Sequence, residues 1–182
     1  QLLKNHNPSM AIRRGVYLVP EDRRRTGIIA GQSIRDNILL SIWQRLANKF
    51  LINDRKGNEI VSDLSSKLNI KMVDMYQYIE TLSGGNQQKV VFAKSISTKP
   101  NILLLDDPTV GIDIGAKSEI TKLIRNIADE GNGVLLVSSE MEELARLCDR
   151  VLVLKRGRIV RELNREKGDI ITEQTLNEAV QS

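Results

Sequence analysis

The chain is short of several residue types that carry chemistry in other proteins. Its 182 residues include one cysteine, Cys148, one histidine, His6, and only 3% aromatic residues. A single cysteine excludes an intrachain disulfide, and a single histidine argues against a metal site built from several histidines. So few aromatic side chains argue against a nucleic-acid surface that works by base stacking. Cys148 lies in an apolar helical pattern, so packing is its expected role.

Long hydrophobic runs are also missing. No stretch approaches the ~20 apolar residues that a membrane-spanning helix needs, and no signal peptide is visible. We therefore expect any association with a membrane to go through a partner. Lysine and arginine outnumber aspartate and glutamate by 27 to 23, and the densest basic run covers only residues 23–25. So mild an excess indicates a solvated surface with some positive charge that faces phosphates.

The apolar residues that are present predict an α/β fold. Hydrophobic residues make up 41% of the chain, which is enough for the core of one domain. Strands are expected at residues 15–19, 102–106, 134–138, 151–154 and 158–162, and helices at about 34–43, 56–68, 86–99, 116–129, 140–147 and 172–180. The alternation of strands and helices after residue 101 indicates a parallel sheet.

Several segments between these elements carry their own expectations. The strand at 102–106 is apolar throughout, which is typical of a sheet covered on both faces. Residues 34–100 contain no convincing strand and are interpreted as a helical insert. Residues 1–9 are expected to form a polar loop and 21–31 a charged loop. Ser33 and Asp36 have the spacing of a capping box at the start of a helix.

Two motifs a short helix apart are the most informative part of the chain. Residues 82–88 read Leu-Ser-Gly-Gly-Asn-Gln-Gln. Residues 102–109 read Ile-Leu-Leu-Leu-Asp-Asp-Pro-Thr, which is typical of an apolar strand that ends in two carboxylates, Asp106 and Asp107. Glycine lets a backbone approach a phosphate closely, and a helix start directs free N–H groups at it. Carboxylates at a strand end can hold Mg²⁺ and orient a water. Either motif alone reads as an ordinary cap, but together they indicate nucleotide chemistry.

Both motifs point to one family. Residues 82–87 resemble the signature loop of the ATP-binding cassette (ABC) family, and residues 102–107 resemble its Walker B strand. The resemblance covers most of the chain, from about residue 11 to about residue 163. Residues 19–27 and 111–117 are similar to the second, C-terminal cassette of the tandem ATPases that drive bacterial import of ribose, galactose, xylose and similar monosaccharides.

The resemblance implies an α/β, P-loop NTPase-like cassette with a parallel sheet and an inserted helical subdomain. The implied divisions are a helical subdomain at about 34–100, a core at about 11–31 and 101–163, and a tail at about 164–182. A P-loop needs the pattern Gly-x-x-x-x-Gly-Lys-Ser/Thr, and this chain contains no Gly-Lys pair. The resemblance implies that the N-terminal part with the P-loop is missing. We therefore expect the 182-residue piece alone to bind ATP weakly or not at all and to be inactive.

The resemblance also implies roles for individual residues. Those that would bind nucleotide are Ser83, Gly84, Gly85, Asn86, Gln87 and Asp113. In the family, the signature closes over the ATP held by an opposite cassette, and Asp113 belongs to a loop that communicates between the paired sites. Asp106 would hold Mg²⁺, and Glu21, at the position of the family's usual glutamine, would be a second ligand. Asp107 and Ser139 occupy the positions of the catalytic glutamate and the switch histidine.

Three of these positions depart from the family's pattern, namely Glu21, Asp107 and Ser139. An aspartate retracts the carboxylate by about 1 Å relative to a glutamate, and a misplacement of that size can cost on the order of 100-fold in rate. Serine has no imidazole, and Ser138 or Ser139 is better explained as a helix cap. We therefore predict that this cassette's own site is slow or degenerate, while its signature completes the site of a partner.

The implied partners are a second ABC cassette, expected in the same polypeptide, transmembrane permease subunits, and indirectly a sugar-binding protein, with ATP and Mg²⁺ as cofactors. No nucleic-acid partner is expected. The implied location is the cytoplasmic face of the bacterial membrane. Two other readings remain open. One is a cassette ATPase that acts on DNA or ribosomes, although the chain lacks coiled-coil heptads and long basic stripes. The other is a non-catalytic regulatory cassette, which the altered catalytic positions favour.

Overall fold

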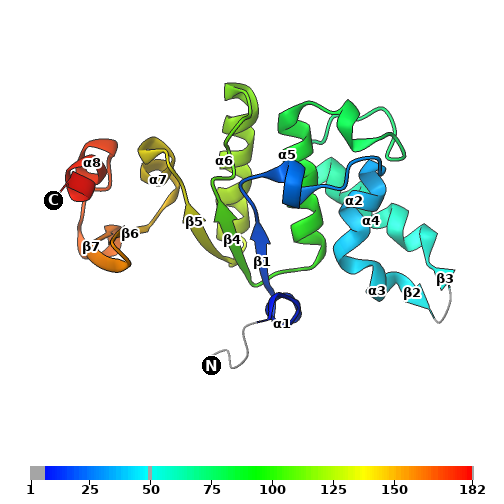
Figure 1. Ribbon diagram of the computed structural model, residues 1–182, viewed down its shortest axis with the longest axis horizontal. Helices are drawn as coiled ribbons and strands as arrows, with labels where there is room; N and C mark the ends of the chain where they lie inside the picture. Colours follow the sequence, from blue (N-terminus) through cyan, green and yellow to red (C-terminus); the bar gives the residue numbers. More distant parts are fainter. Residues whose placement is uncertain (1–6, 49–50, 182) are drawn as a thin grey trace. The chain divides into compact units, whose positions relative to one another are not determined.

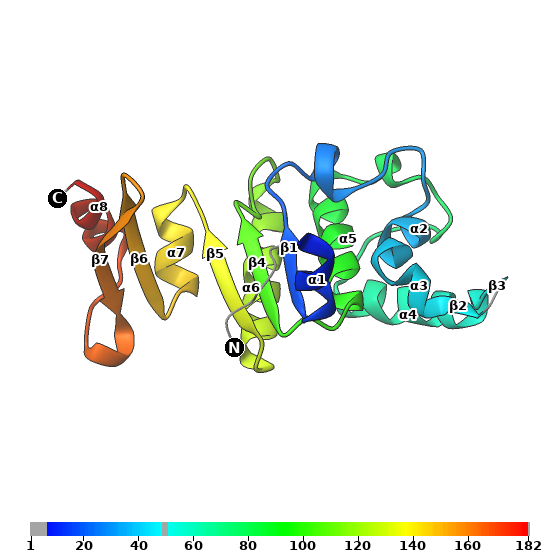
Figure 2. The same ribbon diagram turned by 60° about the horizontal axis from the view of Figure 1, so that its bottom comes forward.

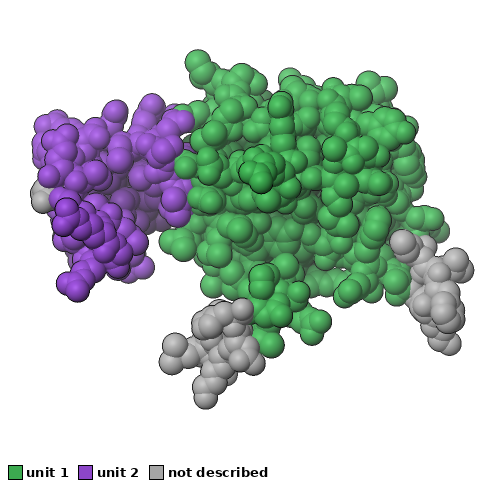
Figure 3. All heavy atoms as spheres, in the orientation of Figure 1, with its two compact units in different colours: residues 1–135 green, residues 136–182 purple. Residues whose placement is uncertain are grey.

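The computed structural model describes residues 7–48 and 51–181 (Figure 1). The chain forms two compact units, residues 1–135 and residues 136–182, which are drawn in different colours in Figure 3. Each unit has its own core. The division of the cassette into insert, core and tail that the resemblance implies stays a prediction, and each unit is described by itself.

The first unit is built on a short sheet with the strand order β1-β4-β5 (Figure 2). These strands are β1 (Val16–Val19), β4 (Ile102–Asp106) and β5 (Gly133–Val137), close to the predicted ranges, and the boundary between the two units falls within β5, after Leu135. β1 and β4 are parallel, and their register runs from Val16 opposite Ile102 to Val19 opposite Leu105. Because parallel strands end at the same edge, the segments after Val19 and after Asp106 are brought together.

The cover of this sheet differs from the expectation. Leu103 and Leu105 are fully buried, because alternate residues of β4 point to the same face of the sheet. On the other face Leu18 is 51% exposed and Ile102 is 42% exposed. The prediction of a sheet covered on both faces is therefore wrong for the described residues. An apolar strand shows that both faces favour burial, but it does not show which segment supplies the cover.

The helical insert begins with α2 (Ile34–Leu39), and Ser33 caps it as the spacing predicts, although Asp36 accepts from the Ser33 hydroxyl and not from its amide as in a full capping box. The amide of Asp36 donates to Ser33 Oγ at 3.0 Å, and Ser33 Oγ donates to Asp36 Oδ2 at 2.7 Å. The short turns η2 (Leu40–Ile42) and α3 (Trp43–Leu46) follow. The long helices are α4 (Asp54–Lys67) and α5 (Gly84–Ser97), joined through the short η3 (Ile79–Thr81). α5 packs against α2, α4 and β1, so it connects the insert to the sheet.

Some local predictions for this unit are wrong. The insert contains a hairpin of β2 (Ala47–Asn48) and β3 (Leu51–Ile52), where no strand was expected. Strands of two residues are too short to show an alternating pattern. The predicted loop at residues 1–9 is a helix, α1 (Pro8–Arg13), from residue 8, while residues 1–6 lie outside the described part. The charged loop at 21–31 contains a π-helical turn, η1 (Arg23–Gly27), whose start is capped by Asp22. The last helix of the unit, α6 (Ile114–Asp129), agrees with the prediction.

The second unit contains α7 (Met141–Leu147), the strands β6 (Arg150–Lys155) and β7 (Arg158–Asn164), the short η4 (Arg165–Lys167) and α8 (Glu173–Gln181). The strands form the predicted antiparallel hairpin. Both turn residues, Arg156 and Gly157, have positive φ, which suits a tight two-residue hairpin. Val151, Val153 and Leu163 share a core with Leu176 of α8. Within residues 7–48 and 51–181, no helix is both long and apolar enough to cross a bilayer.

The core of the second unit confirms the packing role that was predicted for Cys148. The side chain packs against this core and is free of disulfides. Burial, with Asp149 and Glu143 nearby, raises the pKa of the thiol to about 11.

We expect Cys148 to react about 10-fold more slowly than an unperturbed thiol with a disulfide reagent at pH 8. The raised pKa lowers the thiolate fraction about 100-fold, and the greater nucleophilicity of the thiolate that remains recovers about 10-fold. Stopped-flow labelling, with and without denaturant, measures the ratio. Equal rates in both conditions would contradict the buried placement.

Candidate functional site

The start of α5 has the geometry of a phosphate-binding turn. Ser83 is the N-cap, and its Oγ accepts from the amide of Asn86 at 3.4 Å and from Asn86 Nδ2 at 3.0 Å. Because this oxygen already accepts two hydrogen bonds, its own proton remains available to donate to a ligand. Ser83 is exposed, and Gly84 and Gly85 supply the first N–H groups of a helix of 14 residues. The free N–H groups and the helix dipole both favour an anion at this end.

A hollow of about 280 Å³ lies in front of this turn. It brings together four residues that the sequence predicted to bind nucleotide, namely Ser83, Gly85, Asn86 and Asp113. The remaining lining residues are Lys71, Lys89, Gly115, Ala116 and Glu119. Asp113 also caps α6, because its Oδ1 accepts from the amide of Ala116 at 2.8 Å. Capping α6 and lining the hollow are therefore compatible in one position.

The charges around the hollow roughly balance. The buried Lys89 forms an ion pair with Glu119, and its Nζ also donates to the carbonyl of Asn69 at 2.8 Å. The hydrogen bond and charge of Lys89 lower the pKa of Glu119, so Glu119 stays ionised at neutral pH. Among the residues that line the hollow, Lys71 is exposed and Asp113 carries the opposite charge, so the lining side chains offer little net positive charge. A phosphate at this point would depend on the N–H groups and the Ser83 hydroxyl.

Two predicted nucleotide-binding residues of the signature, Gly84 and Gln87, do not line the hollow, and the side chain of Gln87 turns away from it. Its side chain is buried, and its Nε2 donates to the carbonyl oxygens of Ile79 at 3.3 Å and Leu82 at 3.2 Å. These contacts fix the segment that enters the signature turn. Its predicted contact with nucleotide stays a prediction, and the geometry gives it a supporting position behind the turn.

A second group of predicted residues lies at the carboxyl edge of the sheet. Asp106 ends β4, Asp107 follows it with a left-handed φ of 40°, and Glu21 follows the paired strand β1. In the part of the chain that the structure describes, no three side chains of the metal-binding acidic, histidine or cysteine types gather into a ready site. Mg²⁺ is commonly held by one or two carboxylates together with phosphate oxygens. Asp106 and Glu21 therefore fit a site that the nucleotide itself completes.

Ser139 belongs to the unit 136–182, and its assignment to the position of the switch histidine stays a prediction. Its neighbour Ser138 accepts a hydrogen bond from the amide of Glu140 at 3.1 Å and donates to Glu143 Oε2 at 2.5 Å. The N-cap position of α7 is Glu140, without a side-chain cap bond, so the prediction that Ser138 or Ser139 caps this helix is not confirmed, and Ser138 instead holds the segment that enters it.

Comparison with known proteins now decides the family. The model of the family described as ABC transporter matches residues 2–110. The chain belongs to the ABC transporter family. The resemblance found in the sequence is thereby confirmed.

Curated relatives of this ABC chain are sugar-import proteins. It is 45% identical to a ribose import ATP-binding protein, RbsA 2, of Rubrobacter xylanophilus, over 92% of the chain and 32% of the relative. It is also 45% identical to the L-arabinose transport ATP-binding protein AraG of Geobacillus stearothermophilus, over 87% of the chain and 31% of the relative. The chain thus spans about a third of the length of the curated relatives that it matches.

Solved structures confirm the predicted fold class. The cbiO1 protein of Clostridium perfringens, described as part of an ABC transporter complex, superposes with a TM-score of 0.70 at 23% identity, over 94% of this chain and 63% of that one. An ATP-binding cassette solved as a dimer with ADP and Pi superposes with a TM-score of 0.69 at 18% identity, over 88% and 68%. At these identities the likeness establishes the fold alone.

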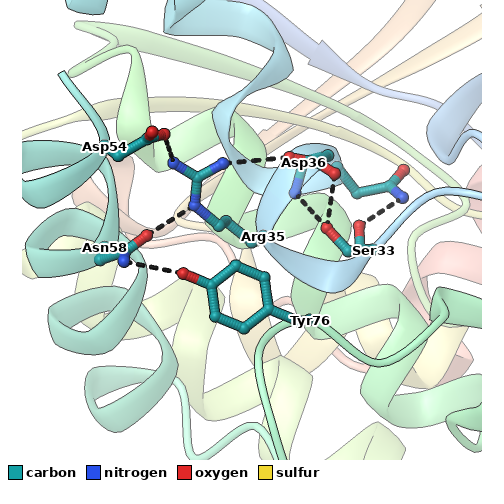
Figure 4. Close-up of polar contacts among 7 residues, drawn as sticks. Ser33, Arg35, Asp36, Asp54, Asn58 and Tyr76 are labelled. Atoms are coloured by element: carbon teal, nitrogen blue, oxygen red, sulfur yellow. Dashed lines mark hydrogen bonds and ion pairs between the residues drawn. The ribbon is translucent and has the colours of Figure 1, made fainter. Parts of the chain in front are cut away.

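Sequence reasoning missed a polar cluster inside the insert of this ABC chain (Figure 4). Arg35 of α2 is buried and donates from Nη2 to Asp54 at 2.6 Å, from Nε to Asn58 at 2.6 Å and from Nη1 to Asp36 at 3.2 Å. Its guanidinium lies 6.0 Å from the ring centroid of Tyr76. This cluster joins α2 and α4 to the segment that leads to the signature. An arginine two positions after a cap carries no local signal of such a role.

Proposed function

We propose that this chain is part of the ATP-binding subunit of a bacterial sugar ABC importer, in which ATP binding and hydrolysis are coupled to transport. The observation that carries the proposal is the hollow that gathers Ser83, Gly85 and Asp113 at the start of α5. The names of the curated relatives support the sugar substrate class. In this proposal the signature turn donates N–H and O–H groups to the terminal phosphate of ATP held by an opposite cassette, which is expected in the same polypeptide.

At the sheet edge, Asp106 and Glu21 would hold Mg²⁺, and the bound Mg²⁺ would neutralise phosphate charge. Asp107 would orient the attacking water, with a shorter reach than the family's glutamate. Glu21, Asp107 and Ser139 together support a slow or degenerate site in this cassette. They also favour the second candidate function, a regulatory cassette that does not turn over ATP.

Membrane permease subunits are the proposed partners, with a sugar-binding protein acting indirectly and the subunit on the cytoplasmic face of the membrane. The support is a group of exposed apolar side chains on two adjacent segments. The backbone amide of Ile34 donates to the backbone carbonyl of Gln77, and the amide of Ile79 donates to the carbonyl of Gln32. The two segments therefore lie side by side. Near that junction Ile29, Tyr76 and Tyr78 are exposed. Exposed apolar side chains gathered in one place are typical of a docking surface.

Substitution of Ser83 should test the proposal in the full-length protein. Ser83→Ala is expected to lower ATP turnover about 10-fold, because one hydrogen bond to a charged group is worth roughly 1.5 kcal/mol. Asp107→Asn is expected to change turnover by less than about 2-fold, because its own site contributes little. A steady-state phosphate-release assay measures both.

Ser33→Ala is the matched control, because Ser33 is also a helix N-cap. Both serine variants should lose about 1 kcal/mol of stability, but only Ser83→Ala should lose turnover. The opposite result, with turnover intact in Ser83→Ala and abolished in Asp107→Asn, would refute the assignment of the signature to a partner's site. Absence of any turnover in the unsubstituted protein with its permease would favour the regulatory cassette.

A further inference from the structure

Arg23 is a buried cation in the segment that follows β1. Only 8% of the residue is exposed, and burial lowers the pKa of the guanidinium, which nevertheless stays charged at neutral pH. Its Nη1 donates to the carbonyl of Val110 at 3.1 Å and its Nη2 to the carbonyl of Gly111 at 3.0 Å. Among the described residues its buried Nε has no hydrogen-bond partner. Such a costly placement needs a reason.

The backbone around Gly111 is shaped to receive this side chain. Gly111 has a φ of 68°, in the left-handed region that favours glycine. In this conformation two successive carbonyl groups both accept from one guanidinium. The planar fork of arginine suits such a pair, whereas a lysine ammonium is a compact point charge that lacks a fixed fork. The loop between Asp107 and Asp113 is therefore fixed by two hydrogen bonds from Arg23, which belongs to a different segment of the chain.

The same guanidinium also lies against the start of α5. A Cβ added to Gly84 would lie 2.6 Å from Arg23 Nη2 and 3.4 Å from the carbonyl oxygen of Gly111. Arg23 thus lies against the signature turn and the 110–111 loop at once. These are the two segments that supply Gly85 and Asp113 to the hollow.

A second buried cation fixes the turn that carries Arg23. Lys94 of α5 donates from Nζ to the carbonyl of Gly27 at 2.6 Å. Gly27 is packed closely on α5, since a Cβ there would lie 3.1 Å from Val91 Cγ2. The η1 turn is therefore attached to α5 at one end and to the 110–111 loop at the other. Glu21, the predicted Mg²⁺ ligand, lies only two residues before Arg23.

We propose that Arg23 is a positioning residue that holds the 110–111 loop against the start of α5, so that Asp113 and the signature turn converge on one phosphate. Because Arg23 is the first residue of η1, it also connects the segment that carries Glu21 to the place where Asp113 and the signature turn meet. This inference rests on the proposed function, because the phosphate is the one that the signature is proposed to bind. A change in Arg23 should therefore affect the geometry of the transition state more than the affinity for ATP.

The test compares Arg23→Ala, Arg23→Lys and the control Arg25→Ala in the full-length protein. Arg25 is exposed in the same turn. Both Arg23 variants should lower kcat of ATP hydrolysis by roughly 10-fold or more with KM within about 2-fold, whereas Arg25→Ala should change neither. Amide hydrogen exchange gives a readout that does not depend on activity. Exchange of the Val110 amide should rise about 10-fold in both Arg23 variants.

Gly84→Ala provides a second route that leaves Arg23 in place. The new methyl group should displace the guanidinium and lower kcat, but it should have much less effect when Arg23 is already alanine. Additive effects of Gly84→Ala and Arg23→Ala would overturn the proposal, as would unchanged kcat or unchanged Val110 exchange in Arg23→Lys. If Ser83→Ala leaves turnover intact while Val110 exchange rises in Arg23→Ala, the proposed function fails and the loop contact still stands.

Discussion

Gly85→Ala is expected to reduce ATP turnover by the full-length protein on the order of 100-fold, because a displacement of about 1 Å at a reacting site has an effect of that size. The reason lies in the contact of two helices. A methyl group on Gly85 would collide with Cβ of Ala116, in the first turn of α6. The starts of α5 and α6 would have to separate, and this would move Ser83 away from Asp113. A phosphate-release assay at saturating ATP measures the loss.

The matched rescue is Ala116→Gly. With that methyl group removed, the nearest remaining neighbours of the new Cβ are Ala116 Cα and Asp113 Oδ2, both at 3.8 Å, which is ordinary contact. The double variant should therefore recover most of the turnover, and Ala116→Gly alone should lose only about 0.5–1 kcal/mol of stability. If the double variant folds normally but stays as inactive as Gly85→Ala, the backbone of Gly85 must approach the nucleotide directly, and the packing explanation is wrong.

Arg35→Ala is expected to lower the free energy of unfolding by about 3 kcal/mol, at roughly 1 kcal/mol for each of three hydrogen bonds of a buried side chain. The cost does not include a stranded buried charge, because the side chain of Asp54 is 77% exposed and keeps its hydration after the change. The substitution removes three hydrogen bonds that join α2 and α4. Urea unfolding followed by circular dichroism measures the loss.

Arg55→Ala is the control for this prediction. Arg55 also pairs with a carboxylate, Glu59, at 3.2 Å, but its side chain is 91% exposed. Exposed pairs of this kind contribute about 0.5 kcal/mol or less. Equal losses for Arg35→Ala and Arg55→Ala would show that the cluster in Figure 4 contributes no more than an ordinary surface pair.

The parts of the fold that sequence reasoning found are those with a local cause. The buried strand β4 and the cap at Ser33 depend on neighbouring residues, so their patterns are visible in the chain itself. The signature turn was found for the same reason, since a serine cap and two glycines determine its shape. The short hairpin of β2 and β3 was missed because two residues cannot display a period of two.

The residues that sequence reasoning missed act over long distances in the chain. Arg23 stands in a run of three arginines, and such a run usually indicates a solvated surface. Its partners, the carbonyls of Val110 and Gly111, lie 87 and 88 residues away and offer no side-chain signal. The motif also assigns Gln87 to nucleotide, which stays a prediction, and the structure shows its amide donating to the carbonyls of Ile79 and Leu82. A motif fixes residue types and spacing, but it leaves open which way each side chain turns.

The cap of α6 has a consequence for the proposed pairing with an opposite cassette. One carboxylate oxygen of Asp113 already accepts from the amide of Ala116, so the orientation of the other is settled within this chain. Immobilising a free side chain at an interface costs about 0.5–1.5 kcal/mol. At this position the side chain is already ordered by folding, so in the proposed pairing with an opposite cassette Asp113 would act as a pre-organised acidic contact.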